Sequence, residues 1–189
     1  MTILGVFAMS IIPFAVAWYL AEHPQILHLG SSNGDLITPP VTTESSEFLG
    51  MDAFSTENLK ELPGHWLLIN LLPQSECNPV CQDALYKSRQ LSLMMGKDIV
   101  RIRRVAIQLQ KTEHSILTGE WLEDARLLKI LAGPTLREKL LKISGDPASD
   151  GMLLLMDPLG NLMMRYPVGF DPYRVKNDLA KLLRISQIG

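Results

Sequence analysis

The sequence predicts an α/β protein in which a mixed central sheet is flanked by helices and preceded by a transmembrane helix. Three observations support this prediction. Apolar stretches of strand length alternate with helical patterns along the last two thirds of the chain. One of these stretches, residues 66–72, is apolar almost throughout, which is typical of a central strand covered on both faces. A further apolar segment of about eighteen residues stands near the N-terminus, where it is just long enough to cross a bilayer.

The N-terminal segment, residues 3–20, is predicted to be a membrane anchor. Trp18 stands near its end, where aromatic residues meet the membrane interface. A cleaved signal peptide is the alternative, because Ala15-Val16-Ala17 resembles a cleavage site. However, no Lys or Arg precedes the apolar segment, and bulky Trp18 follows the small residues directly. An uncleaved anchor over residues 1–22 is therefore the favoured prediction.

The distribution of charge predicts where the soluble part lies. No Lys or Arg occurs between the apolar segment and Lys60, and flanks without positive charge are the kind that cross the membrane. We expect a single-pass inner-membrane protein with its soluble domain in the periplasm, where cysteines can be oxidised. The net charge of −2 gives no basic footprint for nucleic acid, and apolar residues interrupt the basic run 101–104.

Residues 23–54 are predicted to be an extended linker. They are rich in Ser, Thr, Pro and Gly, include Pro39-Pro40, and show no sustained apolar periodicity. The soluble domain is then expected over residues 55–189. It would begin with a short helix over residues 55–62, which Pro63-Gly64 ends.

The strand at residues 66–72 begins a predicted βαβ crossover. A helical pattern runs from Gln82 to Met95, and Gly96 is suited to the position after a helix end. A second strand follows at residues 104–109. Because a helix between two such strands returns the chain in the same direction, the two strands should be parallel.

The remaining elements complete a thioredoxin-like order. Four residues separate the last two predicted strands, so that pair should form an antiparallel hairpin. Asp171-Pro172 is a typical start for the final helix. The predicted elements are helices over residues 120–131, 134–143 and 172–185, and strands over residues 152–156 and 161–166.

Cys77 and Cys81, the only cysteines, stand between the first strand and its helix. A helix N-terminus stabilises a thiolate, which favours redox chemistry or binding of a soft metal such as Cu(I). On a helix, the C-x3-C spacing would place both thiols on one face as i, i+4 neighbours. We therefore expect shared metal ligation to be favoured over a tight disulfide, while a structural pair remains the third alternative.

The histidines offer one candidate further ligand. His114 follows the second strand and could approach the cysteines, although a solvated loop residue is the simpler interpretation. His65 precedes the first strand, at its opposite end from the cysteines, and His23 and His28 adjoin the predicted anchor. Two thiolates alone can bind Cu(I), but they coordinate Cu(II) poorly. No hydrolase triad, phosphate-binding glycine loop or dinucleotide fingerprint is present in the sequence.

The cysteine loop after a buried strand, the C-x3-C spacing, the N-terminal anchor and the Asp157-Pro158-Leu159-Gly160 hairpin resemble the Sco/SenC family of membrane-anchored thioredoxin-fold proteins. The likeness is closer still to small membrane proteins found with haem-copper oxidase genes in proteobacteria. The matching segments are residues 33–37 with Pro39-Pro40, 85–90, 96–98, 156–167 and 176–189.

This resemblance implies a role in delivering copper to cytochrome c oxidase, with Cys77 and Cys81 as Cu(I) ligands. An oxidase subunit or its assembly factors would be the partner. The chain departs from the family pattern in two places. The family shows C-P-x-x-C-P where this sequence has Cys77-Asn78-Pro79-Val80-Cys81-Gln82, and the family's histidine ligand falls where this sequence has Ser149-Asp150.

The sequence therefore leads to an assembly factor, rather than an enzyme, that handles Cu(I) or partner thiols. The alternative is a periplasmic thiol-disulfide oxidoreductase with Cys77 and Cys81 as its catalytic pair. A docking subunit with a static bridge is the third hypothesis.

Overall fold

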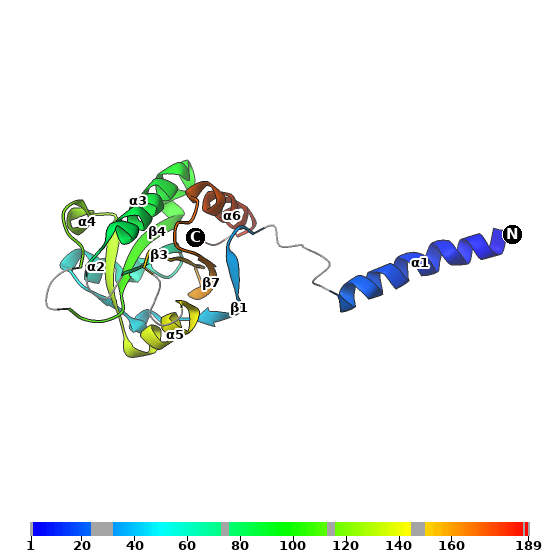
Figure 1. Ribbon diagram of the computed structural model, residues 1–189, viewed down its shortest axis with the longest axis horizontal. Coiled ribbons are helices and arrows are strands. Elements are labelled where there is room, and N and C mark those ends of the chain that lie inside the picture. The colour runs from blue at the N-terminus through cyan, green and yellow to red at the C-terminus, as the bar shows by residue number, and fades with distance from the viewer. Residues whose placement is uncertain are drawn as a thin grey trace. The chain divides into compact units, whose positions relative to one another are not determined.

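The computed structural model describes residues 2–23, 32–72, 76–112, 116–144, 150–186 and 188. The chain divides into two compact units, Met1–Ser31 and Ser32–Gly189. The first unit contains helix α1 (Thr2–Glu22), which Figure 1 shows in blue. Within the described ranges, no helix meets both the length and the apolarity needed to cross a bilayer. The helix is thus confirmed, and its role as an anchor stays a prediction.

The second unit is built on one seven-stranded sheet with the order β1-β7-β6-β3-β4-β5-β2. Strands β3, β4 and β5 are parallel to one another, and the remaining pairs are antiparallel. The central position of β3 explains its apolar sequence, since all seven of its residues are buried. The strands are β1 (Asp35–Thr42), β2 (Phe48–Gly50), β3 (Trp66–Leu72), β4 (Ile102–Gln108), β5 (Leu127–Ala132), β6 (Leu153–Met156) and β7 (Asn161–Tyr166).

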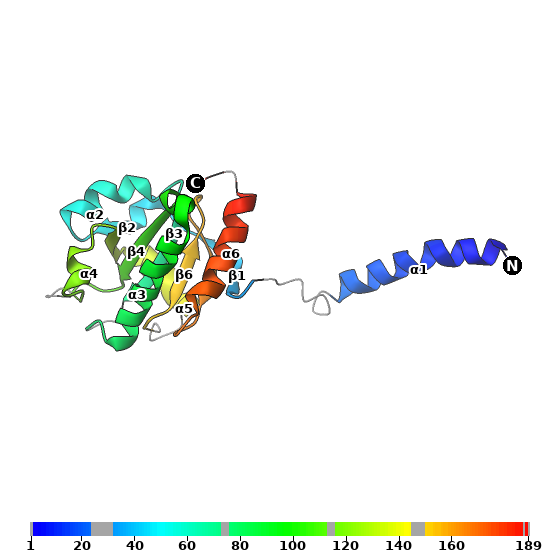
Figure 2. The same ribbon diagram turned by 90° about the horizontal axis from the view of Figure 1, so that it is seen from above.

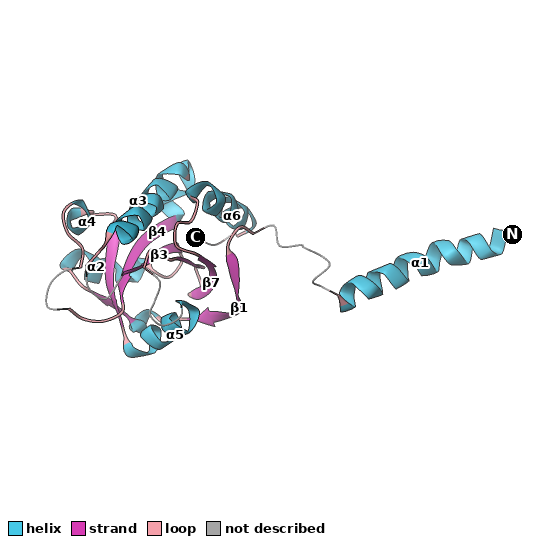
Figure 3. Cartoon of the chain, in the orientation of Figure 1, coloured by secondary structure: helices cyan, strands magenta, loops and turns pink. Residues whose placement is uncertain are grey.

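Helices cover both faces of this sheet (Figures 2 and 3). Because side chains alternate along β3, Leu68 packs on the face covered by α3 and α6, whereas Leu67 and Ile69 pack on the face covered by α5. The α-helices are α2 (Ala53–Asn58), α3 (Pro79–Met94), α4 (Glu120–Glu123), α5 (Pro134–Ser144) and α6 (Pro172–Ile185). Three 3-10 helices, η1 (Ser45–Glu47), η2 (Leu59–Glu61) and η3 (Gly96–Arg101), complete the described elements.

The structure confirms the predicted thioredoxin-like order. Strand β3 has the predicted bounds, and β4 pairs with it in parallel after the α3 crossover. The hairpin of β6 and β7 is antiparallel, and Asp171 caps α6 by accepting a hydrogen bond from the backbone of Tyr173. Helix α3 begins at Pro79, three residues before the predicted start.

The helix predicted over residues 120–131 is wrong beyond its first turn. Only Glu120–Glu123 is helical, and Leu127–Ala132 forms strand β5 between β4 and β2. Lys129 of this strand is buried and pairs with Asp52 at 2.9 Å. Sheet pairing and this ion pair between residues far apart in the sequence therefore override the local helical pattern.

The predicted linker over residues 23–54 is also corrected in part. Strand β1 pairs with β7, and β2 pairs with β5, so these residues form the two edges of the sheet. The folded unit begins at Ser32 rather than at Ser55. The short helix starts earlier than expected as well, because Asp52 caps α2 through the backbone N–H of Ser55.

The start of the folded unit is fastened to the last helix by Asp178, a buried residue of α6. Its Oδ2 accepts hydrogen bonds from the backbone N–H of Asn33 at 2.7 Å and of Gly34 at 3.1 Å. The hydroxyl of Tyr166 donates to the same oxygen at 3.2 Å. Burial and the nearby negative charge raise the pKa of Tyr166, so this hydroxyl stays a donor. Asn33 and Gly34 are thus part of the fold and not of a linker.

Candidate functional site

The candidate site lies where the chain leaves the carboxyl end of β3 and enters α3. Asn78 has extended backbone angles and caps the helix, with its side-chain Oδ1 accepting a hydrogen bond from the backbone N–H of Cys81 at 2.9 Å. Pro79 occupies the first helical position, where a missing N–H has no cost. The Asn-Pro pair therefore fixes the helix start between the two cysteines.

A disulfide joins Cys77 and Cys81, whose Cα atoms are 5.2 Å apart. This corrects the expectation that the spacing favours metal ligation over a tight disulfide. Cys77 precedes the capping residue and lies outside the helix, so the two thiols are not i, i+4 neighbours on one helical face. The turn at Asn78 brings Cys77 back over the first turn of α3, within the Cα separation that a disulfide requires.

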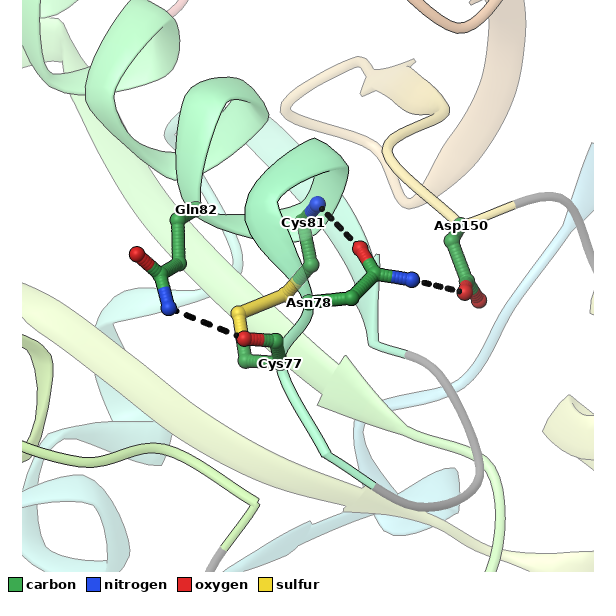
Figure 4. Close-up of a disulfide and its surroundings, with 5 residues drawn as sticks. All are labelled: Cys77, Asn78, Cys81, Gln82 and Asp150. Carbon is green, nitrogen blue, oxygen red and sulfur yellow. Dashed lines mark hydrogen bonds between the residues drawn. A yellow bond between two sulfur atoms is a disulfide. The ribbon is translucent and has the colours of Figure 1, made fainter.

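Side-chain hydrogen bonds hold the loop around this bridge (Figure 4). The side-chain amide of Gln82 donates to the carbonyl of Cys77 at 3.0 Å. The amide nitrogen of Asn78 donates to Oδ2 of Asp150 at 2.9 Å, which ties the helix start to the segment that enters β6. Asn78 therefore uses both ends of its amide, one toward the helix and one toward a residue 72 positions away.

The two cysteines differ in accessibility. Cys77 is 9% exposed and Cys81 is 2% exposed. Both pack in an apolar cluster with residues of β3, α3, β4, the segment before α4, α4 and β5, namely Leu72, Leu85, Ala106, Ile116, Leu117, Trp121 and Leu127. Cys77 is thus the sulfur at the edge of the site, and Cys81 is covered by the protein.

Gly151 allows a close approach to the first turn of α3. Its φ is +79°, and a Cβ at this position would stand 2.9 Å from Cγ1 of Val80. The segment before β6 therefore lies directly against the helix turn that contains Cys81. Val80 itself is exposed, as are Glu76 and Pro79, so the outer surface of the turn is open to a partner.

Among the residues that the structure describes, no third metal ligand joins the cysteines. Within the described ranges, no group of three or more His, Cys, Asp or Glu residues could hold a metal ion. His114, the candidate third ligand, lies outside the described residues. His65 bonds through Nδ1 to the carbonyl of Glu61 before β3, which agrees with its predicted place away from the cysteines.

Sequence reasoning located both cysteines but missed the residues that shape the site. The Asn-Pro signal for a helix start was available, because Asn is a preferred cap and Pro is favoured at the next position. Gln82 could also be placed near the loop from its sequence position. The contact with Asp150 had no local signal, because it depends on how β6 packs beside β3.

Comparisons with known proteins agree with the thioredoxin-like fold. The family model described as "Transmembrane-like, thioredoxin-like, C-terminal domain" matches residues 66–186. No curated protein sequence matches the chain.

Similar solved structures include Sco proteins. Apo Sco1 from Thermus thermophilus is 12% identical with a TM-score of 0.55, covering 80% of this chain and 97% of that one. Yeast Sco1 with copper bound is 18% identical with a TM-score of 0.52, covering 67% and 83%. BsSco, described by its disulfide switch and as a member of the Sco family of cytochrome c oxidase assembly proteins, is 14% identical with a TM-score of 0.50, covering 79% and 96%. At these identities the likeness shows a common fold.

Proposed function

Because the chain belongs to the transmembrane-like, thioredoxin-like C-terminal domain family, we propose that it assists assembly of a haem-copper cytochrome oxidase through Cys77 and Cys81. The observation that carries this proposal is the disulfide at the start of α3, directly after the central strand. An oxidised pair at a helix N-terminus, with one sulfur at the protein edge, suits thiol-disulfide exchange with a partner protein. The oxidase connection is supported by what BsSco is described to do.

In the proposed exchange, the reduced chain acts on a partner's disulfide. The Cys77 thiolate attacks one partner sulfur, the partner's S–S bond breaks, and the other partner sulfur leaves as a thiolate. The Cys81 thiolate then attacks Sγ of Cys77, which forms the intramolecular bridge and releases the second partner sulfur. The partner gains two electrons and this chain loses them. The greater exposure of Cys77 supports this order of attack.

Binding of Cu(I) by the reduced pair is the second candidate function. Two thiolates can hold Cu(I) in a linear arrangement, and yeast Sco1, which has a similar fold, has been solved with copper bound. Asp150 stands near the cysteine turn where the Sco-like pattern has a histidine. A carboxylate is a hard ligand that adds little to a Cu(I) site, so we expect Cu(I) binding without tight Cu(II) binding.

The place of action is proposed to be the periplasmic side of the inner membrane, with α1 as the anchor. The apolar sequence of residues 3–20 and the lack of Lys or Arg before Lys60 support this proposal. An alkaline phosphatase fused after Gly189 should be active, because this enzyme requires periplasmic disulfides. An inactive phosphatase combined with an active cytoplasmic reporter would contradict the proposed location.

The cysteines are tested by Cys77→Ser and Cys81→Ser in the full-length chain, with Asp83→Asn as a control in the same helix turn. Exchange predicts that Cys81→Ser traps a partner adduct through Cys77, whereas Cys77→Ser forms none. Acid-quenched cell extracts on nonreducing gels would show this difference. Cu(I) binding instead predicts that each single variant loses tight binding as fully as the double variant, because one thiolate cannot make a two-coordinate site.

A static bridge predicts a third pattern, in which both single variants lose about 2 kcal/mol of stability and show neither adduct nor copper phenotype. Wild-type oxidase assembly in the double variant would remove both chemical roles and leave a docking subunit. The Asp83→Asn control should match the wild type in each assay, because Asp83 is exposed and its ion pair among the described residues is the one with Lys87 on the same helix.

A further inference from the structure

A pocket of about 410 Å³ lies at the opposite end of the parallel strands from the cysteines. Residues of α2, η2, α3, η3, β4 and β5 and of the turn before β5 line it. Among them are three arginines, Arg103, Arg104 and Arg126. The volume falls within the range of small-molecule sites.

The sheet register explains why the arginines gather there. Arg104 on β4 is paired with Leu127 on β5, so Arg103 and Arg126 each stand one residue before a member of this pair. Adjacent strands are about 4.8 Å apart, which keeps the three backbone positions close. Arg103 and Arg104 belong to the basic run 101–104, for which the sequence predicts no binding site.

Arg104 is a buried cation whose donors are only partly used. The residue is 4% exposed, and its Nη1 donates to Oδ2 of Asp124 at 2.8 Å. Its Nε and Nη2 have no hydrogen-bond partner among the described residues. Burial lowers the pKa of Arg104, and the pairing with Asp124 opposes that shift. Unpaired buried donors are costly, so the guanidinium of Arg104 is a cation that the protein alone satisfies only in part, at the wall of the pocket.

The charges around the pocket do not balance. Arg103 pairs with Glu61 at 2.7 Å, and Arg104 pairs with Asp124. The backbone N–H of Arg126 donates to Asp124, but its guanidinium makes no hydrogen bond or ion pair within the part of the chain that the structure describes. Three guanidinium groups therefore face two carboxylates, which leaves one positive charge in excess.

The rest of the wall is apolar and partly open to solvent. Phe54 is 40% exposed and Val100 is 66% exposed, while Leu128, which also lines the pocket, is buried. A ligand that carried only charge would leave these surfaces in contact with water. A ligand with an apolar body and one anionic group would cover both kinds of surface.

We propose that this pocket binds a small organic anion, whose charged group meets the exposed guanidinium of Arg126 beside the buried charge of Arg104 and whose apolar body packs on Phe54 and Val100. The ligand class is a carboxylate, sulfonate or phosphate with an aromatic or aliphatic part. The pocket is concave and of small-molecule size, which favours such a ligand over a long acidic peptide. The proposal does not rest on the function assigned to the cysteines.

The test uses naphthalene-2-sulfonate and its uncharged counterpart naphthalene-2-sulfonamide, which have the same ring and nearly the same size. Calorimetric titration of the full-length chain should show binding of the sulfonate and at least about tenfold weaker binding of the sulfonamide, because a charge-assisted hydrogen bond is lost. Arg126→Gln should raise the sulfonate Kd about tenfold for the same reason. Val100→Asp, at an exposed position, should also weaken binding by placing a negative charge at the pocket.

Arg184→Gln is the matched control, because Arg184 is an exposed arginine on α6 that does not line the pocket. It should leave the Kd unchanged, and circular dichroism should show that all variants remain folded. Equal binding of the sulfonate and the sulfonamide would overturn the proposal, as would an unchanged Kd in both Arg126→Gln and Val100→Asp. Saturable binding of hexaglutamate without binding of the sulfonate would also overturn it, in favour of an acidic peptide.

Discussion

At the carboxyl end of β3 the chain is held by a disulfide and by the amides of Asn78 and Gln82, whereas at the amino end of β4 it is held by ion pairs. The two ends of the parallel strands are thus stabilised by different interactions, a covalent bridge at one end and ion pairs at the other. The amide hydrogen bonds of Asn78 and Gln82 do not require the bridge, so they are retained when it is reduced. Loss of one carboxylate at the other end would leave the buried guanidinium of Arg104 unpaired.

This difference suggests that chemistry and stability are assigned to opposite ends of the sheet. The cysteine end can change its covalent state at modest cost, because a five-residue loop constrains the unfolded chain only slightly. The stability of the arginine end depends on Glu61 and Asp124 remaining ionised as partners of Arg103 and Arg104. Variants at the two ends should therefore differ in size of effect, in pH dependence and in which activity they alter.

The largest effect on stability is expected from Asp124→Ala at the arginine end. Removing one partner of a buried ion pair should lower the free energy of unfolding by about 3 kcal/mol. Urea unfolding followed by circular dichroism would measure it. Glu120→Gln is the matched control, because Glu120 is 60% exposed and its pair with Arg89 should contribute less than about 1 kcal/mol. Equal losses in the two variants would contradict the proposed importance of the buried pair.

The next effect is a dependence of stability on acid. Burial of Asp124 favours its protonated form, but hydrogen bonds from Arg104 and the backbone of Arg126, with the charge of Arg104, outweigh burial and hold the pKa of Asp124 below 3.8. The carboxylate therefore stabilises the fold above its unfolded pKa, and this stabilisation is lost as pH falls through the lower folded value.

Urea unfolding between pH 6 and pH 2.5 should show a falling free energy below about pH 4. In Asp124→Ala, the free energy of unfolding should fall less steeply over this pH range. The remainder is expected from Asp52, where burial raises the pKa but bonds from Ser55 and Lys129 outweigh it. An unchanged pH profile in Asp124→Ala would show that the pair with Arg104 does not set the acid response.

A smaller effect is expected at the cysteine end from Asn78→Ala, which removes the helix cap. The free energy of unfolding should fall by about 1 kcal/mol, whereas Asn78→Ser should retain most of it because Ser is also a good cap. The same variants report on chemistry, since the cap positions the backbone of Cys81. A change in the reduction potential of the cysteine pair in Asn78→Ala, restored in Asn78→Ser, would link the cap to the bridge.

The smallest effect is expected from Asp150→Ala, which removes one partly exposed hydrogen bond to Asn78. A loss of about 0.5 kcal/mol is expected. In the double variant with Asn78→Ala, this loss should disappear, because the bond is already absent. Additive losses in that cycle would mean that Asp150 acts on the fold by a route other than Asn78.

The parts of the fold that the sequence predicted well have local signals. Strand β3 is apolar throughout, and the β6–β7 hairpin is marked by Asp157-Pro158-Leu159-Gly160. Strands β1 and β5 were missed because their pairing is long-range. Pro39-Pro40 suggests a linker until β7 is known to lie alongside, and Lys129 suggests a surface until Asp52 is known to reach it.

The candidate site shows the same division. Two cysteines at a strand-to-helix junction were readable from the sequence, whereas their pairing as a disulfide required the turn at Asn78. The excess charge at Arg126 was not readable, because it depends on the register between β4 and β5. Residues brought together by tertiary pairing leave no periodic pattern in the sequence.

The junction at Asp178 has an evolutionary consequence. A Cβ on Gly34 would stand 2.5 Å from the ring of Tyr166, so a larger residue at position 34 becomes acceptable only after Tyr166 has become smaller. Asp178 in turn accepts hydrogen bonds from Asn33, Gly34 and Tyr166. If Asp178 is replaced, these bonds are lost, and selection no longer maintains Asn33 and Tyr166 as their donors. Substitutions at these positions should therefore occur jointly among related chains, coupling the inheritance of two segments that lie 144 residues apart.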